Sequence, residues 1–319
     1  MRAFSGVCKM RKILLAVVCA FFMVSCGEDG SKSSEFVNML TLSDTAFPVL
    51  VSARAVDVDR VELVFDEDVF ARKDAFSPCY SEINGNVLTL YPQTGIKAGT
   101  SVRLQGTVRD GAGNSATFSV EVWGYNPDPA VMRINEFTTK GTKTRPDRTE
   151  LKVLDGGSLA GMALYDGIPG DYRTVCILPD ENVQAGDFVV VWWCEALPDG
   201  VKQHENSVVN VCSGGGLSEN NGILSLSVSP EHGADVQDAV VWCSGESVQY
   251  EGYGTREVLD RVEKARAMSW WDGEPVYSAW SASTRSMALG RDGRWYTTVQ
   301  GGASFGSENT SQEYVGSGQ

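Results

Sequence analysis

Short runs in which apolar and polar residues alternate, separated by turn residues, are the feature that most constrains this fold. Between residues 47 and 123 the runs RVELVF, NVLTLYP, SVRLQGTV and ATFSVEVW place apolar side chains at every second position. This period of two is typical of a strand with one buried face. Turn signals such as Asn84-Gly85 recur between the runs. The pattern predicts a β-sandwich over residues 45–124. The positions expected to be buried are Val61, Leu63, Phe65, Val102, Leu104, Val108, Ala116, Phe118, Val120 and Val122.

A second β-rich region is expected over residues 131–310. The segment GYNPDPA precedes it, and its two prolines favour an extended linker at residues 125–130. DFVVVWW is a continuous apolar run, which indicates a strand that is buried on both faces or central in a sandwich. NNGILSLSV alternates serine with leucine and also reads as a strand.

One amphipathic helix is predicted, in TREVLDRVEKARAM. Thr255 can cap its N-terminus, and one apolar stripe runs along it. The stripe consists of Val258, Leu259, Val262 and Ala265. We expect this stripe to pack against the edge of the sandwich. The helix lies in a stretch, residues 246–282, that looks inserted into the second region.

The first region resembles a bacterial immunoglobulin-like domain in the order of its strands and turns. The matching positions are Phe65, Gly99, Thr100, Asp110, Gly113 and Asn114. The turn DGAGN could hold calcium, because a hard cation prefers oxygen ligands. The favoured alternative is a turn in which Asp and Asn bind backbone groups and Gly supplies a positive φ. No metal site is therefore predicted.

The second region resembles a lamin-tail domain, an immunoglobulin-like module. The matching segments are RINEF, TELKVL, SLAGMALYDG, QAGDFVVVWW and VQDAVVW, and a later piece, STRSMALGRDGRWYTTVQGGASFGSEN, resembles the usual ending. Met162 replaces the usual Trp, and Lys152-Val153 replaces a Tyr-Asn pair. Together the two resemblances imply an all-β chain with two immunoglobulin-like β-sandwich domains in tandem and one short helix in an insertion of the second. Residues 311–319 are then a C-terminal tail.

The N-terminus resembles a bacterial lipoprotein signal. A basic segment precedes an apolar run, Ile13 to Val24, that is short for a membrane span. In such signals the cysteine after a small residue is lipidated, so residues 1–25 would be removed and Cys26 would carry the lipid. Met10 could be the true start, and a plain signal peptide cut near here is the alternative. The acidic, serine-rich stretch that follows indicates a flexible tether over residues 26–44.

Charge and cysteine usage limit the partners of the chain. The formal net charge is −14, and removal of the four basic residues in 1–25 would bring it near −18. Such a chain repels phosphate backbones, so no nucleic-acid partner is expected. Five cysteines follow Cys26, an odd number that cannot pair fully. Cys194 could bond Cys212 or Cys243, or the five could be buried free thiols that act as small apolar residues.

No catalytic site is predicted. The one G-x-S-x-G, GASFG at residues 302–306, has no His or Asp after it and is treated as chance. His204 and His232 lie in polar loops without a metal-binding spacing, and solvated histidines are the default interpretation. Glu136 and Glu150 match positions of the lamin-tail pattern, and we expect them to accept hydrogen bonds rather than act as acid and base.

Aromatic residues gather in the stretch 246–282. Such clusters can stack on sugars or form interface hot spots. The alternative is a small satellite core that covers the helix. The residues considered for ligand binding are Trp270, Trp271, Trp280, Tyr250 and Tyr253.

These observations predict a non-catalytic protein of the bacterial cell envelope, anchored by lipid on Cys26 to the outer membrane or at the periplasmic face. Its sandwiches would serve adhesion, interaction or scaffolding with an unknown protein or polysaccharide, and no cofactor is expected. The alternatives are a metal-dependent hydrolase that uses the loop histidines, or a carbohydrate-binding module that uses the aromatic insertion.

Overall fold

The computed structural model describes residues 44–316 except 73–74, 77 and 232–233. Residues 47–319 belong to one compact unit. Cys26 and the signal and tether predicted around it lie outside the described residues. Within this unit the described residues form two β-sandwiches with separate apolar cores, which confirms the all-β prediction. The division at residues 125–130 stays a prediction.

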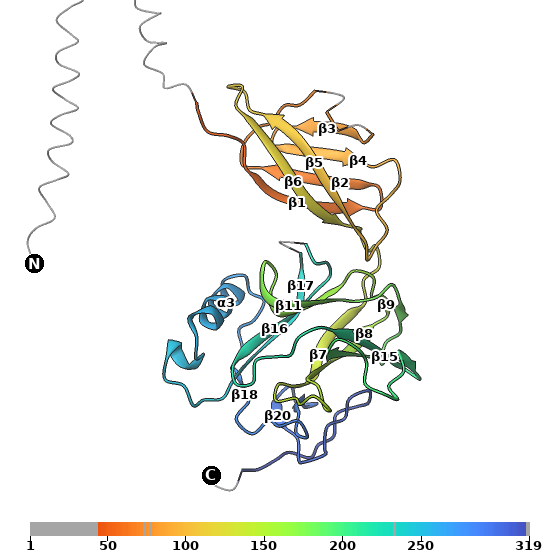
Figure 1. Ribbon diagram of the computed structural model, residues 1–319, viewed down its shortest axis with the longest axis vertical. Coiled ribbons are helices and arrows are strands. Elements are labelled where there is room, and N and C mark those ends of the chain that lie inside the picture. The colour runs from red at the N-terminus through yellow and green to blue at the C-terminus, as the bar shows by residue number, and fades with distance from the viewer. Residues whose placement is uncertain (1–43, 73–74, 77, 232–233, 317–319) are drawn as a thin grey trace, which may run out of the picture. The chain divides into compact units, whose positions relative to one another are not determined.

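The first sandwich pairs a four-stranded antiparallel sheet with a two-stranded one (Figure 1). The larger sheet has the order β1-β2-β4-β3, and β5 pairs with β6 in the smaller one. Gly85 forms the predicted β3–β4 turn at φ +60°. The strands are β1 (Leu50–Asp57), β2 (Arg60–Phe65), β3 (Tyr80–Asn84), β4 (Val87–Tyr91), β5 (Ser101–Arg109) and β6 (Ser115–Trp123).

Alternation along these strands builds the first core as predicted. Val61, Leu63 and Phe65 are buried in β2 while their neighbours are partly exposed. Val102 is the exception: it is 37% exposed near the start of β5, although its cross-strand neighbour Val122 is buried. The other predicted positions contribute to this core.

Gly106 of β5 is required by close packing in that core. A Cβ at this position would lie 2.3 Å from the ring of Phe76 and 2.9 Å from that of Phe118. Those two rings stack with centroids 6.1 Å apart. A larger residue at position 106 would therefore displace one of the rings.

The second sandwich has a five-stranded and a seven-stranded sheet, with the orders β11-β10-β16-β17-β18 and β14-β15-β13-β8-β7-β19-β20. β9 and β12 form a small separate pair. The strands are β7 (Val131–Thr138), β8 (Arg148–Asp155), β9 (Gly157–Ser158), β10 (Ala163–Ile168), β11 (Asp171–Ile177), β12 (Asn182–Val183), β13 (Phe188–Trp193), β14 (His204–Glu205), β15 (Val208–Ser213), β16 (Gly222–Ser227), β17 (Val236–Cys243), β18 (Val276–Tyr277), β19 (Met287–Leu289) and β20 (Trp295–Thr297).

The inner faces of these two sheets enclose one large apolar core. Leu151 and Val189 from the seven-stranded sheet and Leu164 and Leu224 from the five-stranded sheet belong to it. The DFVVVWW run forms β13, which is almost wholly buried and lies between β8 and β15, as predicted. Burial of apolar surface on this scale is the main source of stability in a domain of this kind.

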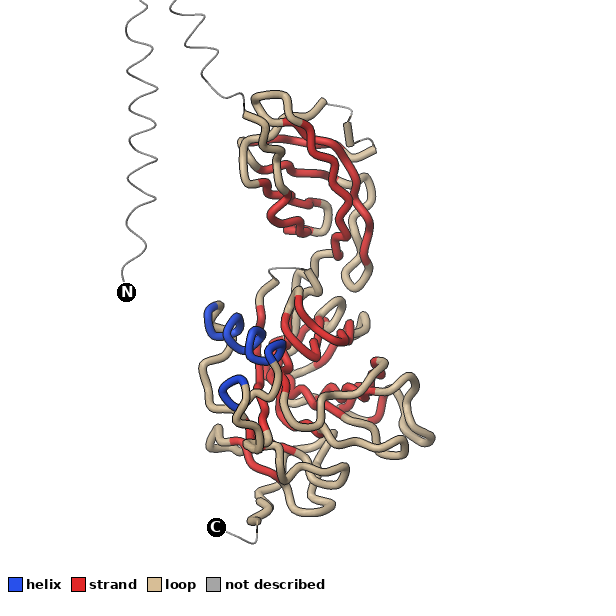
Figure 2. Tube along the Cα trace, turned by 60° about the vertical axis from the view of Figure 1, so that its left-hand side comes forward, coloured by secondary structure: helices blue, strands red, loops and turns tan. Residues whose placement is uncertain are grey.

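The helix α3 (Arg256–Ala267) covers a sheet face rather than an edge, which corrects the prediction of edge packing. It lies against β10 and β16, two inner strands of the five-stranded sheet (Figures 1 and 2). Thr255 caps it, with its hydroxyl accepting from the Val258 N–H at 3.3 Å. The predicted stripe packs on Ile223 and Val241, which point away from the main core. Because both of its faces are covered, β16 is buried along its whole length.

The aromatic residues of the insertion belong mainly to this third layer. Tyr253 and Trp271 are 5% and 8% exposed in the satellite core, and Trp270 packs beside them. Trp280 lies elsewhere, between Tyr277 and Tyr314. Tyr250, in the short 3₁₀ helix η2 (Tyr250–Gly252), is exposed. The five residues therefore do not form one exposed face, and the buried rings match the alternative of a satellite core.

The five cysteines of the described chain are free thiols, and only Cys212 among them is exposed. The free thiols match the second of the two arrangements considered, but their expected burial holds only for Cys176. No helix of the described residues is long and apolar enough to cross a membrane.

We expect Trp271→Ala to destabilise the chain by about 3–5 kcal/mol, because it empties a site in the satellite core. The guanidinium of Arg266 also lies 5.0 Å from the ring centroid and would lose this contact. Thermal melts of the full chain measure the effect. Val248→Ala is the control in the same insertion. That side chain is 96% exposed, so the free energy of unfolding should change by less than about 0.5 kcal/mol. Equal melts for the two variants would contradict the buried placement of Trp271.

Candidate functional site

The outer face of the seven-stranded sheet carries a row of charged residues. In β8, Leu151 and Val153 point into the main core, so Glu150 and Lys152 point outward. A bulge in β7 between Ile134 and Glu136 changes the alternation there, and Glu136 lies directly across from Glu150. Two carboxylates are thus neighbours on one sheet face. Both residues are 0% exposed.

The segment Gly301–Thr310, here called the C-terminal strap, supplies the donors for Glu136. The Ser304 N–H lies 3.0 and 3.1 Å from the two carboxylate oxygens of Glu136, and the Ser304 hydroxyl donates at 3.0 Å. The Ser286 hydroxyl donates to the same carboxylate. The GASFG motif is therefore structural, since its serine holds the strap to β7.

Glu150 binds the strap as well. Asn135 Nδ2 donates to one of its oxygens at 2.7 Å, and the Gly306 N–H donates to the other. Gly306 has φ +86°, and a Cβ there would lie 3.1 Å from the side chain of Val208. Only glycine meets both conditions without strain. The prediction that Glu136 and Glu150 accept hydrogen bonds is confirmed.

Arg148 completes the contacts beneath the strap. Its guanidinium carbon lies 3.9 Å from the ring centroid of Phe305 and 4.9 Å from that of Trp192. The positive charge of Arg148 acts on both glutamates. An Arg between two aromatic faces combines charge compensation with apolar packing.

Burial controls the protonation of the two glutamates. It raises the pKa of Glu150 from 4.5 to about 8, against the opposing effect of the hydrogen bonds from Asn135 and Gly306. Burial also raises the pKa of Glu136, although the bonds from Ser286 and Ser304 favour its ionised form. Raised carboxyl pKa values also occur in enzymes, but here the oxygens already hold the strap.

A cavity of about 400 Å³ lies between the helix α3 and the five-stranded sheet. Burial raises the pKa of Asp166 there to about 6, and Arg173 lies 3.5 Å from its carboxylate. Arg261, on α3, donates to Asp171 at 2.7 and 2.9 Å and pairs with Glu257. The Arg261–Asp171 pair fastens the helix to β11, whereas the pair with Glu257 lies within α3.

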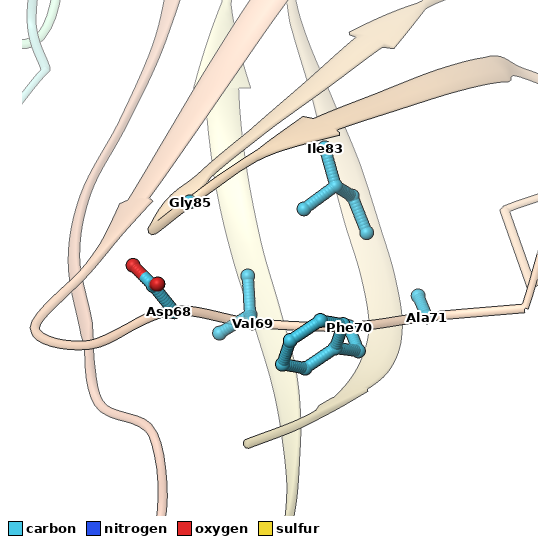
Figure 3. A pocket seen from close by; sticks show the side chains of 6 residues that line it. All are labelled: Asp68, Val69, Phe70, Ala71, Ile83 and Gly85. Atoms are coloured by element: carbon cyan, nitrogen blue, oxygen red, sulfur yellow. The ribbon is translucent and has the colours of Figure 1, made fainter. Parts of the chain in front are cut away.

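The first sandwich has a pocket of about 290 Å³ beside the β3–β4 turn. Figure 3 shows Asp68, Val69, Phe70, Ala71, Ile83 and Gly85 around it. Asp68 is the one charged residue in this lining, and Phe70 is 58% exposed. The pocket therefore offers an apolar surface with a single carboxylate.

The structure brings together few of the residues considered from the sequence. His204 is exposed in β14 with Nε2 3.4 Å from Glu181, and His232 lies outside the described residues. Asp110 of the DGAGN turn accepts from the backbone and side-chain amides of Asn114 at 2.8 and 2.6 Å, as expected for a turn.

Sequence reasoning missed the residues that hold the strap. Ser304 lies 168 positions from Glu136 in the chain, and Asn309 lies 174 from Asn135. Local periodicity carries no information on such contacts. The signal that was available is a pair of glutamates, Glu136 and Glu150, each followed by an apolar residue in a predicted strand.

We expect the thermal midpoint to fall as pH rises from 4.5 to about 8, the unfolded and folded pKa values of Glu150. Over this range the folded chain holds a proton that the unfolded chain has lost, so the free energy of unfolding decreases with pH. Melts across this range should show a weaker pH dependence for Glu150→Gln. Glu263→Gln, on the exposed side of α3, is the control and should keep the wild-type slope. An unchanged slope in Glu150→Gln would mean that this carboxyl titrates normally.

Comparison with known proteins gives one match. Searches of curated proteins and of solved structures found no similar chain. A family model described as a protein second domain, TP_1001_2nd, matches residues 130–298, which is more than half of the 319 residues and runs from the start of β7 to the end of β20. The chain therefore belongs to the TP_1001 second-domain family.

Proposed function

We propose that this chain is a lipid-anchored protein of the bacterial cell envelope whose β-sandwiches are non-catalytic modules for adhesion, interaction or scaffolding. The anchor is supported by the basic segment, the apolar run and Cys26, followed by a stretch too polar to form a core. Lipid on Cys26 would hold the folded body at the membrane.

The observation that carries the non-catalytic part of the proposal is the engagement of the buried carboxylates. Glu136 and Glu150 have the raised pKa values that a general acid would need. Their oxygens, however, are bonded to Ser286, Ser304, Asn135 and Gly306. A group beneath a bonded segment cannot reach a substrate, so these two glutamates serve the fold.

The sheet arrangement supports the proposed relation to lamin-tail domains. The RINEF segment forms β7, which pairs with β8 from TELKVL, and β8 pairs with β13 from DFVVVWW. An ordered set of strands in two facing sheets is what that resemblance implies for the second sandwich.

The two alternatives receive less support from the described residues. A hydrolase would need His204 beside other ligands, but the partner that the structure gives it is one partly exposed glutamate, Glu181. A carbohydrate site in the insertion would need exposed rings, but Tyr253 and Trp271 are core residues.

The anchor is tested by Cys26→Ser. We expect the variant to leave the detergent phase on phase partition, or to accumulate as uncleaved precursor, because position 26 no longer has a thiol to carry the lipid. A labelled fatty acid supplied to the cells should mark the wild-type chain and not the variant. Stable anchoring needs two acyl chains or an equivalent second signal. A chain without lipid on Cys26 should therefore leave the membrane fraction almost completely.

The control for this experiment is Cys212→Ser, which removes an exposed thiol from the folded body. It should partition and take up label like the wild type. Normal processing and unchanged membrane partition of Cys26→Ser would contradict the lipoprotein assignment.

A further inference from the structure

A polar cavity of about 800 Å³ lies beside the C-terminal strap on the second sandwich. It is bordered by β7 and β8, by the turn between β19 and β20, and by residues 308–313. Small-molecule sites in proteins usually enclose about 300–1,000 Å³. The cavity is therefore large enough for a ligand of one or two sugar rings and much too large for a lone ion.

The lining of this cavity is basic in a chain that is strongly acidic. Four cationic side chains face three carboxylates, whereas the whole chain has a net charge of −14. The cations are Arg133, Lys152, Arg291 and Arg294, and the carboxylates are Asp292, Glu308 and Glu313.

The three carboxylates are compensated by two of the cations. Lys152 pairs with Glu308. Arg294 lies 3.0 Å from Glu313 and 3.7 Å from Asp292. Arg133 and Arg291 have no ion pair within 4.0 Å among the residues that the structure describes. The charge of Arg133 acts on the buried carboxylate of Asp238, so Arg291 is the cation of the lining with no carboxylate assigned to it.

Arg133 shows a second sign of an unfilled site. Its Nε is buried and has no hydrogen-bond partner among the described residues, although buried polar groups in folded proteins are nearly always bonded. Asp238 is influenced by the charge of Arg133, but its carboxylate accepts from the Ile134 and Ala239 N–H groups. Arg133 therefore has an unbonded donor next to the cavity that it lines; this Nε is enclosed, so a ligand would have to bind the terminal guanidinium nitrogens.

We propose that this cavity binds an acidic sugar and that Arg133 and Arg291 hold its carboxylate. A guanidinium presents parallel donors that match a carboxylate in two-point geometry. The rest of the wall carries the amide and hydroxyl groups of Asn135, Tyr296, Asn309, Thr310 and Ser311. The first four already donate hydrogen bonds within the chain, but the Oδ1 of Asn135 and the three hydroxyl oxygens can still accept from sugar hydroxyls. Leu289 is the one large aliphatic side chain in the lining.

An acidic sugar is also compatible with the negative electrostatic field of the whole chain. A dense polyanion such as nucleic acid would be repelled by the surrounding negative charge. A sugar with one carboxylate places a single charge in the basic cavity and leaves neutral hydroxyls elsewhere. The inference deepens the proposed function by naming the ligand class of a binding module, and it rests on that function only for its biological setting.

Titration calorimetry on the full chain in detergent tests the proposal with sodium glucuronate, glucose and inorganic phosphate as separate probes. We expect glucuronate to bind, and Arg133→Gln and Arg291→Gln each to weaken it by at least about tenfold, because one charged contact is lost. Arg256→Gln removes an exposed arginine on α3, remote from the cavity lining, and should bind like the wild type. Thermal melts show whether each variant is folded. If Arg133→Gln is unstable, Arg291→Gln provides the test, because Arg291 lies on an exposed turn.

Three results would overturn the proposal. Glucose binding as tightly as glucuronate would mean that the carboxylate is not recognised. Phosphate binding while glucuronate does not would assign the cavity to a different anion. Equal affinity in wild type and both arginine variants would place any binding elsewhere. Each result is separate from the anchor experiment, because the cavity is the same in a chain with or without lipid.

Discussion

The hydrogen bonds between two buried glutamates and the C-terminal strap determine the shape of the outer face of the second sandwich. Without the strap, Glu136 and Glu150 would be adjacent carboxylates on a sheet, and their repulsion would favour separation. The N–H groups of Ser304 and Gly306 and the charge of Arg148 compensate them. The strap in turn brings residues 308–313 beside β8 and so forms one wall of the large polar cavity.

Burial has opposite consequences on the two sides of this sheet. On the inner side it stabilises the sandwich through apolar contact. On the outer side it desolvates charged groups, which costs free energy unless each is bonded or protonated. Glu150 responds with a pKa of about 8, so near neutral pH much of it is protonated. The strap is thus held by groups whose charge depends on pH.

The parts of the structure that could be predicted are those with a local cause. Alternation placed Val61, Leu63 and Phe65 on one face, and the capped apolar stripe located α3. The face that α3 covers depends on contacts with β10 and β16, far away in the chain, and its placement at an edge was wrong. The same alternation already implies that Arg133 and Lys152 point to one face of the sheet and that Ile134 and Leu151 point to the other face. It could not show that the turn at Arg291 comes near them.

An acidic chain with a basic cavity selects its ligand by charge density as well as by contact. The long-range field repels anions, and screening at physiological salt limits it to about 8 Å. Within that distance Arg133 and Arg291, which have no ion pair within 4.0 Å among the described residues, would act directly on a ligand in the cavity. An anion with one charge and many hydroxyls is repelled only weakly as it approaches, and on binding it contacts both arginines. A densely charged anion experiences a stronger repulsion from the acidic surface as a whole. The distribution of charge therefore favours sparsely charged, hydroxyl-rich ligands over polyphosphates of the same size.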